Sequence, residues 1–221
     1  MADQVTYQGR LIAIDGSRGK AVTRAAAAVV AGLKAAGIEC AVSRWDASGL
    51  FGELAGGRGD RTISPRTLSL VYAADLAFRL RWEIGPVLQA GGVVIAAPYI
   101  ETAVAFGSNC NLDERWLREL LRFAPVAHWR GLTVEKKLSN PWKRRLDRGY
   151  LEYCAAMLDA SEPGCVAKAA RRRTVAKLDQ ARGRRIYALS DAGVAALTTA
   201  VTGSRRDAPS RRSSPPRNGR K

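Results

Sequence analysis

The chain alternates between short apolar runs and longer segments whose apolar positions recur every three or four residues. Three short segments, residues 9–14, 38–44 and 92–99, predict β-strands, and the last is apolar throughout, as a buried parallel strand requires. The segments 23–37 and 64–91 between them predict helices. Strands joined by helical crossovers of this length indicate an α/β fold with a parallel sheet and right-handed connections.

Local signals mark where these helices begin and end. Ser64 is placed as an N-cap with Pro65 at the first helical position, and Gly37 is placed to end the first helix. The glycine-rich residues 49–62 interrupt regular structure before the long helix.

The pattern weakens beyond residue 110. Residues 112–124 and 144–160 predict amphipathic helices, residues 184–191 a last strand, and residues 192–201 a final helix. Residues 203–221 lack core-forming side chains and are rich in Arg, Ser and Pro, which predicts a disordered basic tail. We therefore expect one domain over residues 1–202, followed by this tail.

Composition narrows the class of protein. Of 221 residues, 47% are apolar, enough for one sizeable core, and no run approaches the roughly 18 apolar residues of a membrane span. The N-terminus lacks the layout of a signal peptide. The four cysteines show no C-x-x-C spacing, and the single histidine, His128, makes a Cys/His zinc site implausible. These features predict a cytoplasmic protein with no membrane partner.

The net charge of +16 is concentrated toward the C-terminus. Basic residues exceed acidic ones by 4 over residues 1–140 and by 12 over residues 141–221. This asymmetry predicts a polyanionic partner, most simply nucleic acid or bound phosphates, or else a solvated basic surface. Both interpretations stay open at this point.

The stretch "SPRTLSLVYAADLAFRLRWEIGPVLQAGGVVIAAPYIETAVAFG", Ser64–Gly107, strongly resembles the thymidylate kinase family. In that family, the corresponding helix begins S-P-R-T and continues to A-A-D-R, and the family's next strand ends in D-R-Y. "GRLIAIDG", "LKAAGIECAVSR" and "RRLDRGYLEYCAAM" also resemble that family. The resemblance implies a P-loop kinase fold with about five parallel strands and helices on both faces. It also implies phosphoryl transfer from ATP to thymidine monophosphate with Mg²⁺, and commonly a homodimer.

The resemblance raises a question about the phosphate loop, whose pattern is G-x-x-x-x-G-K-[ST]. Aligned without gaps, the loop starts at Gly16, so that Ala21 stands at the second glycine and Val22 at the lysine. Only Thr23 keeps the hydroxyl that would hold Mg²⁺. The candidate phosphate ligands in this part of the chain are Gly16, Ser17, Gly19, Lys20 and Thr23.

A second register pairs Gly19 and Lys20 with the family's G-K. It places Ile14 at the first glycine and Ala21 at the hydroxyl position, and it needs a two-residue slip in the helix. Neither register gives a complete site, and we favour the first because it requires no insertion or deletion.

Other phosphate contacts of the family are also absent. Its D-R-Y is replaced by Ala97, Pro98 and Tyr99, and the arginine of A-A-D-R is Leu76. Because catalysis of phosphoryl transfer depends on positioned positive charge and metal, we expect weak or no activity. If activity survives, Lys20, Arg18 and Arg79 are the candidate substitutes.

The same resemblance implies that part of the pocket for the acceptor nucleotide is retained. Tyr72 falls where the family stacks an aromatic ring on thymine, and Glu101 replaces an aspartate near the sugar. The full set of expected pocket residues is Asp15, Arg44, Arg66, Tyr72, Tyr99 and Glu101. The alternative is that Tyr72, Phe78 and Trp82 form core at helical spacing and that Arg66 contacts only the start of its helix.

The remaining segments leave two further predictions. The family's arginine-bearing lid is expected to be shortened around residues 128–145. Residues 182–197, "RGRRIYALSDAGVAAL", also look like the basic wing and helix of winged-helix regulators. Three functions therefore stay open: a degenerate thymidylate-kinase-like protein acting by nucleotide or partner binding, an active thymidylate kinase, and a nucleic-acid-binding protein.

Overall fold

The structure is a computed structural model of the chain, and it describes residues 7–16, 19–45, 47–50, 64–109, 111–133 and 186–206. Its strands are β1 (Arg10–Asp15), β2 (Cys40–Arg44), β3 (Val93–Ala97), β4 (Trp129–Leu132) and β5 (Ile186–Ala188). Its helices are α1 (Gly19–Ala35), α3 (Pro65–Arg79), the π-helical η1 (Leu80–Ile84), α4 (Gly85–Gln89), α5 (Ile100–Asn109), α6 (Glu114–Leu120) and α9 (Asp191–Arg206).

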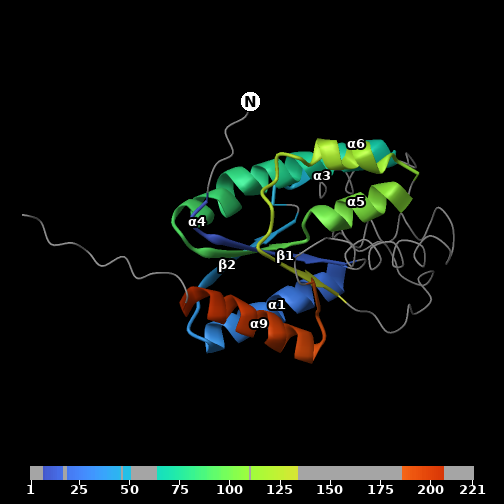
Figure 1. Cartoon of the computed structure of the whole chain (residues 1–221). Helices are drawn as coiled ribbons and strands as arrows, with labels where there is room; N and C mark the ends of the chain where they lie inside the picture. Colours follow the sequence, from blue (N-terminus) through green and yellow to red (C-terminus); the bar gives the residue numbers. More distant parts are fainter. Residues whose placement is uncertain are drawn as a thin grey trace, which may run out of the picture.

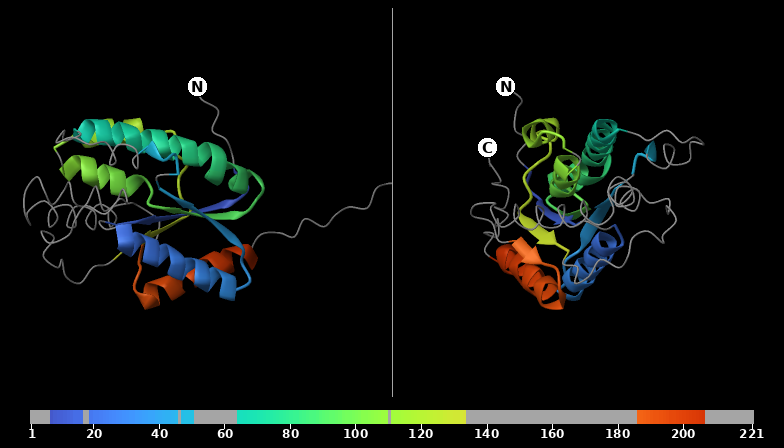
Figure 2. Two further views of the ribbon diagram at one scale, coloured as in Figure 1. Left: turned by 180° about the vertical axis from the view of Figure 1, so that it is seen from behind. Right: turned by 90° about the vertical axis from the view of Figure 1, so that its right-hand side faces the viewer.

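The five strands form one sheet in the order β2-β3-β1-β4-β5, and every pair in it is parallel. Helices cover both faces: α1 and α9 pack together on one side, while α3, α4, α5 and α6 lie on the other (Figures 1 and 2). The predicted α/β fold with a parallel sheet and two helical layers is confirmed.

The predicted cap at the start of α3 is confirmed. The Ser64 hydroxyl accepts a hydrogen bond from the amide of Thr67 at 3.1 Å, and Pro65 is the first helical residue. The helix predicted over residues 64–91 is confirmed: α3, η1 and α4 follow one another without a gap from Pro65 to Gln89, and η1 is a π-helical segment within this run. Gly37 adopts φ +73° directly after α1, as expected for a glycine that ends a helix.

Two helix boundaries and two further elements differ from the sequence prediction. Helix α1 begins at Gly19, four residues before the predicted start at residue 23. Helix α5 was not predicted, and β4 forms where the sequence offers only a poor apolar strand. Helix α9 continues to Arg206, so the expected boundary at residue 202 falls inside it. The helix predicted at 144–160 and the tail from 207 onward lie outside the described residues.

The core gathers the buried faces of β1 and β3 with the inner faces of the surrounding helices. Leu11, Ile12, Ile14, Val94 and Ile95 are almost completely buried. These two strands are central in the sheet and covered on both sides, which explains why their sequences are apolar at consecutive positions. Within the described part of the chain, every helix falls short of the length and apolarity needed to cross a bilayer.

Two glycines of α9 allow a matched test of this packing. A Cβ at Gly193 would overlap the carbonyl oxygen of Ala188, whereas a Cβ at Gly203 would meet nothing within 4 Å. We expect Gly193→Ala to lower the free energy of unfolding by about 1–3 kcal/mol, because backbone atoms must move to admit the methyl group. The control Gly203→Ala should be neutral or stabilising by up to about 1 kcal/mol. Urea unfolding measures both, and equal effects would contradict this packing.

Candidate functional site

The candidate site lies at the carboxyl ends of β1 and β3. These strands are neighbours, yet the helices that follow them, α1 and α5, lie on opposite faces of the sheet (Figure 1). Ligands of open α/β sheets bind where neighbouring strands send their connections to opposite faces, because the diverging chains leave a crevice there. Asp15 ends β1 at this point, and Pro98 and Tyr99 follow β3.

A single oxygen of Asp15 binds three donors at this point. Its Oδ1 accepts the amide of Tyr99 at 2.9 Å, the amide of Thr102 at 3.0 Å and the Thr102 hydroxyl at 2.7 Å. The donors belong to the start of α5, so the carboxyl group caps a helix that is remote from it in sequence. The Asp15 side chain thereby fixes the end of β1 to the first turn of α5.

Burial changes the ionisation of this carboxyl group. Loss of solvent raises the pKa of Asp15, the hydrogen bond from the Thr102 hydroxyl opposes that change, and the charge of Glu101 reinforces it. Tyr99 next to it is also buried, and loss of solvent raises the pKa of its phenol. The Tyr99 hydroxyl therefore stays protonated at neutral pH and donates to the carbonyl of Pro125 at 2.6 Å.

The connection from β1 to α1 is short. The strand ends at Asp15 and the helix begins at Gly19. In the gapless register, the position of the phosphate-binding lysine is Val22, whose side chain is 1% exposed and part of the core. Thr23 is exposed on α1. In the second register, Gly19 and Lys20 open the helix as G-K requires, but Ile14 then lies buried inside β1.

Gly16 is in close contact with side chains of the protein itself. A Cβ at Gly16 would overlap the Thr133 hydroxyl, so this threonine, directly after β4, packs on the glycine. The Gly16 amide donates to the Thr102 hydroxyl at 3.1 Å. The Gly16 backbone is therefore bonded to the protein itself, whereas a phosphate loop directs its amides at the ligand.

Tyr72 is enclosed by other side chains. It is 1% exposed, its hydroxyl donates to the carbonyl of Tyr99 at 2.6 Å, and its ring stacks with Trp45 at a centroid distance of 5.3 Å and an interplanar angle of 27°. The indole of Trp45 thus occupies one face of the ring that was expected to stack on thymine. Phe78 and Trp82 are exposed, so the alternative core interpretation fits Tyr72 alone among the three.

Glu101 is paired with two arginines. Its Oε2 lies 3.3 Å from Nη2 of Arg118, and its Oε1 lies 3.3 Å from Nη1 of Arg130. The carboxylate is mostly buried, and Arg130 is partly buried in β4. This cluster joins α5, α6 and β4 beside Asp15, and the arginines neutralise the Glu101 charge locally.

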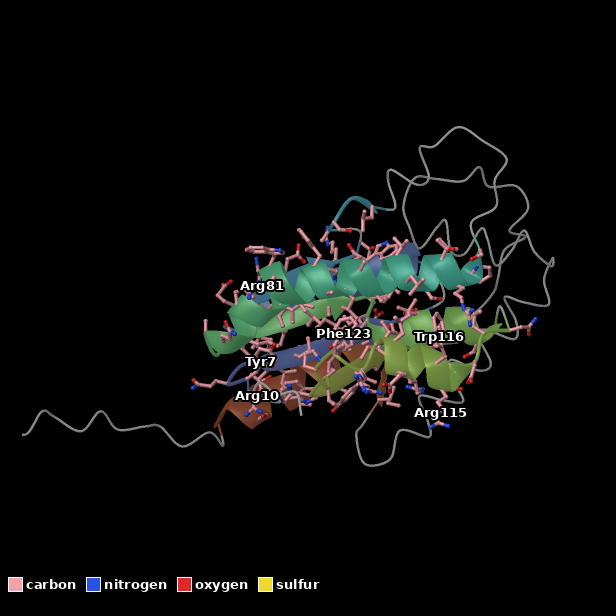
Figure 3. The ribbon with its side chains drawn as sticks, turned by 90° about the horizontal axis from the view of Figure 1, so that it is seen from above. Tyr7, Arg10, Arg81, Arg115, Trp116 and Phe123 are labelled. Atoms are coloured by element: carbon pink, nitrogen blue, oxygen red, sulfur yellow. The ribbon has the colours of Figure 1, made fainter. Side chains whose placement is uncertain are left out.

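The three arginines predicted near phosphate occupy different surroundings. Arg44 is exposed at the end of β2, and Arg66 is exposed with its guanidinium 5.1 Å from the ring centroid of Trp116 on α6. Arg79 is completely buried and lies between the ends of β2 and β3, bonded to Ser43 and to the carbonyl of Pro98. In Figure 3, Trp116 is seen on α6, beside the long helix that carries Arg66 and Arg79.

Some predicted residues lie outside the described part of the chain. These are Ser17, Arg18, the side chain of Lys20, and the lid segment from residue 134 onward. The basic residues 182–185 of the winged-helix interpretation lie there too, so the nucleic-acid hypothesis stays a prediction. Of the expected set, the structure brings Asp15, Tyr72 and Tyr99 together through hydrogen bonds.

Sequence reasoning missed four residues of this edge: Ser43, Trp45, Thr102 and Thr133. Ser43, Trp45 and Thr133 stand at or just after the ends of strands, the positions that the topology of a parallel sheet brings to one edge. That positional signal was available for β2. It was not available for Thr102, which lies in a helix that the sequence did not predict.

The fold and the strand–loop–helix unit at its central strand are consistent with the P-loop kinase class of α/β proteins. No model of a protein family matches the chain. Three curated proteins named "Thymidylate kinase" are similar to it. The protein of Thermomicrobium roseum is 32% identical over 130 residues, 56% of this chain and 60% of that protein. That of Leifsonia xyli subsp. xyli is 34% identical over 107 residues, which are 48% of this chain and 50% of that protein. That of Clavibacter michiganensis subsp. michiganensis is 37% identical over 87 residues, which are 38% of this chain and 41% of that protein.

These matches show that the chain is thymidylate-kinase-like over about half of its length, which confirms the resemblance predicted from its sequence. The chain spans 60% or less of the length of these relatives.

The raised pKa of Asp15 predicts how stability depends on pH. The folded state holds this proton more tightly than the unfolded chain, so the stabilisation is complete below about pH 4 and is lost as pH rises through the folded-state pKa. Asp15→Asn keeps an acceptor oxygen and removes the charge. We expect the stability of the variant relative to wild type to increase between pH 4 and neutrality, as measured by urea unfolding.

A second variant separates charge from hydrogen bonding. Asp15→Ala leaves the Tyr99 and Thr102 donors without their acceptor and should cost at least about 2 kcal/mol at every pH. A difference between wild type and Asp15→Asn that is constant with pH would contradict the assigned ionisation.

Proposed function

We propose that the protein is a thymidylate-kinase-like nucleotide-binding protein whose phosphoryl-transfer activity is weak or absent. The observation that carries this proposal is the burial of Val22, which stands at the lysine position of the gapless register, in a helix that already begins at Gly19. The phosphate loop pattern has four residues between its glycines and a lysine that neutralises the β- and γ-phosphates. Neither register of this chain supplies both features.

The residues present do not fit a Mg²⁺–ATP site. Thr133 covers Gly16, the Gly16 amide is bonded to Thr102, and no acid or guanidinium follows β3 where Ala97 and Pro98 stand. Thr23, the hydroxyl residue of the gapless register, lies at an exposed position on α1. We therefore derive no phosphoryl-transfer step for this chain.

The acceptor side supports the proposal of nucleotide binding. Asp15, Tyr72 and Tyr99 lie at the carboxyl edge of the sheet, where ligands of such folds bind, and exposed Arg44 adds positive charge at the end of β2. A nucleoside monophosphate, thymidine monophosphate by analogy with the relatives' name, is the ligand we propose. Stacking on Tyr72 would require Trp45 to move, and Glu101 would contact a sugar only from within its arginine cluster. Arg66 on the exposed start of α3 would act at the rim.

The kinase reaction tests the first part of the proposal. In a coupled assay of ADP release with thymidine monophosphate and Mg²⁺–ATP, we expect a kcat below about 0.01 s⁻¹, roughly a hundredfold under the lower end of kinase values. Lys20→Ala should leave this background unchanged, as should the control Lys34→Ala at the other end of α1. Robust turnover that disappears only in Lys20→Ala would establish an active kinase.

Binding tests the second part. A thermal-shift panel of nucleoside mono- and triphosphates should show stabilisation by thymidine monophosphate and a smaller or no effect of ATP. The absence of a shift with every nucleotide would overturn nucleotide binding and leave partner binding as the function.

A further inference from the structure

The buried side chain of Arg79 forms no ion pair with any acidic residue that the structure describes. The side chain of Arg79 is 0% exposed. Its Nε donates to the Ser43 hydroxyl at 2.8 Å, and its Nη2 donates to the carbonyls of Ser43 and Pro98, each at 3.0 Å. All three acceptors are uncharged. They anchor the guanidinium between the ends of β2 and β3 without neutralising it.

The remaining nitrogen, Nη1, is buried and has no hydrogen-bond partner among the described residues. In that same part of the chain, Arg79 forms no ion pair with a carboxylate. Arg79 is connected to an acidic side chain indirectly: Glu83 accepts a hydrogen bond from the Ser43 hydroxyl at 2.6 Å, and that hydroxyl is the acceptor of Arg79 Nε. An unpaired buried donor on a charged group is costly, so its retention calls for a water or an ion at that point.

The position of the guanidinium points to a ligand. It lies at the carboxyl edge of the sheet, against the last residues of β2 and the residue after β3, where Pro98 itself provides a bonded carbonyl. This edge is where open α/β sheets bind ligands. Arginine also holds phosphate oxygens strongly because its donors are permanently charged and fixed in one plane.

We propose that Nη1 of Arg79 binds an oxygen of a phosphate group, and that this is the anion site of the protein. The source of the phosphate, a nucleoside monophosphate or the free ion, rests on the proposed function, whereas the anion site itself does not. Ser43 and Pro98 orient the guanidinium so that its one unused nitrogen is available to the ligand. Because Nη1 is shielded from solvent, the side chains around it must move when the ligand enters.

Isothermal titration calorimetry on the full chain tests the proposal with inorganic phosphate, thymidine monophosphate and thymidine. Arg79→Met removes the charge at similar volume, and we expect it to weaken both phosphate-bearing ligands by about tenfold or more while leaving any thymidine binding unchanged. Arg79→Lys keeps the charge and should restore part of the affinity.

The matched control is Arg81→Met, which removes an arginine two residues further along the chain, in η1. Arg81 is exposed on η1, with its guanidinium 5.5 Å from the ring centroid of Trp82 (Figure 3). It should bind phosphate like wild type. Equal losses in Arg79→Met and Arg81→Met would reduce the effect to net charge and overturn the site.

If Arg79→Met fails to fold, wild type and Arg81→Met still decide the matter. Phosphate should raise the midpoint of thermal unfolding of wild type above that in chloride at equal ionic strength, and Arg81→Met, which keeps the buried guanidinium of Arg79, should retain this shift. The absence of a phosphate-specific shift in wild type would assign Nη1 to a buried water and overturn the proposal.

The outcomes also separate this inference from the proposed function. Phosphate binding that depends on Arg79, with no nucleotide bound, would support the anion site and refute nucleotide binding. Equal binding of thymidine monophosphate by wild type and Arg79→Met would support nucleotide binding and refute the anion site at Arg79.

Discussion

The carboxyl group of Asp15 holds the functional edge of this fold together. It ends the central strand, and its three hydrogen bonds fix the start of α5 at the point where the chain leaves β3. Because α1 and α5 depart to opposite faces, this edge would otherwise be open. The Asp15 carboxyl group is buried at this edge, and the loss of solvent raises its pKa.

Contacts within the protein also involve the residues around the start of α1. The helix begins at Gly19, Thr133 packs on Gly16, and Val22 points into the core. Each feature uses a group or a space that a phosphate loop leaves for its ligand. In the gapless register the lysine position is Val22, which packs in the core, and the Gly16 amide is bonded within the protein.

The acceptor side shows a similar replacement by different chemistry. Trp45 stacks on Tyr72, and two arginines neutralise Glu101, so aromatic and ionic contacts within the chain occupy groups that were expected to meet a nucleotide. Among the described residues, Nη1 of Arg79 has no hydrogen-bond partner, and the Thr133 hydroxyl also lacks one. What singles out Nη1 is that it belongs to a buried cation.

The sequence by itself determined the α/β class, the first three strands, the capped start of α3 and the resemblance to thymidylate kinases. These features depend on local periodicity, on capping chemistry and on a long ungapped match. It could not determine α5, the early start of α1 or the stacking of Trp45 on Tyr72. These depend on contacts between residues far apart in the chain, such as Asp15 with Thr102 and Gly16 with Thr133. Only the tertiary structure decided which polar groups are satisfied, because a hydrogen-bond partner is set by the meeting of strand ends in space.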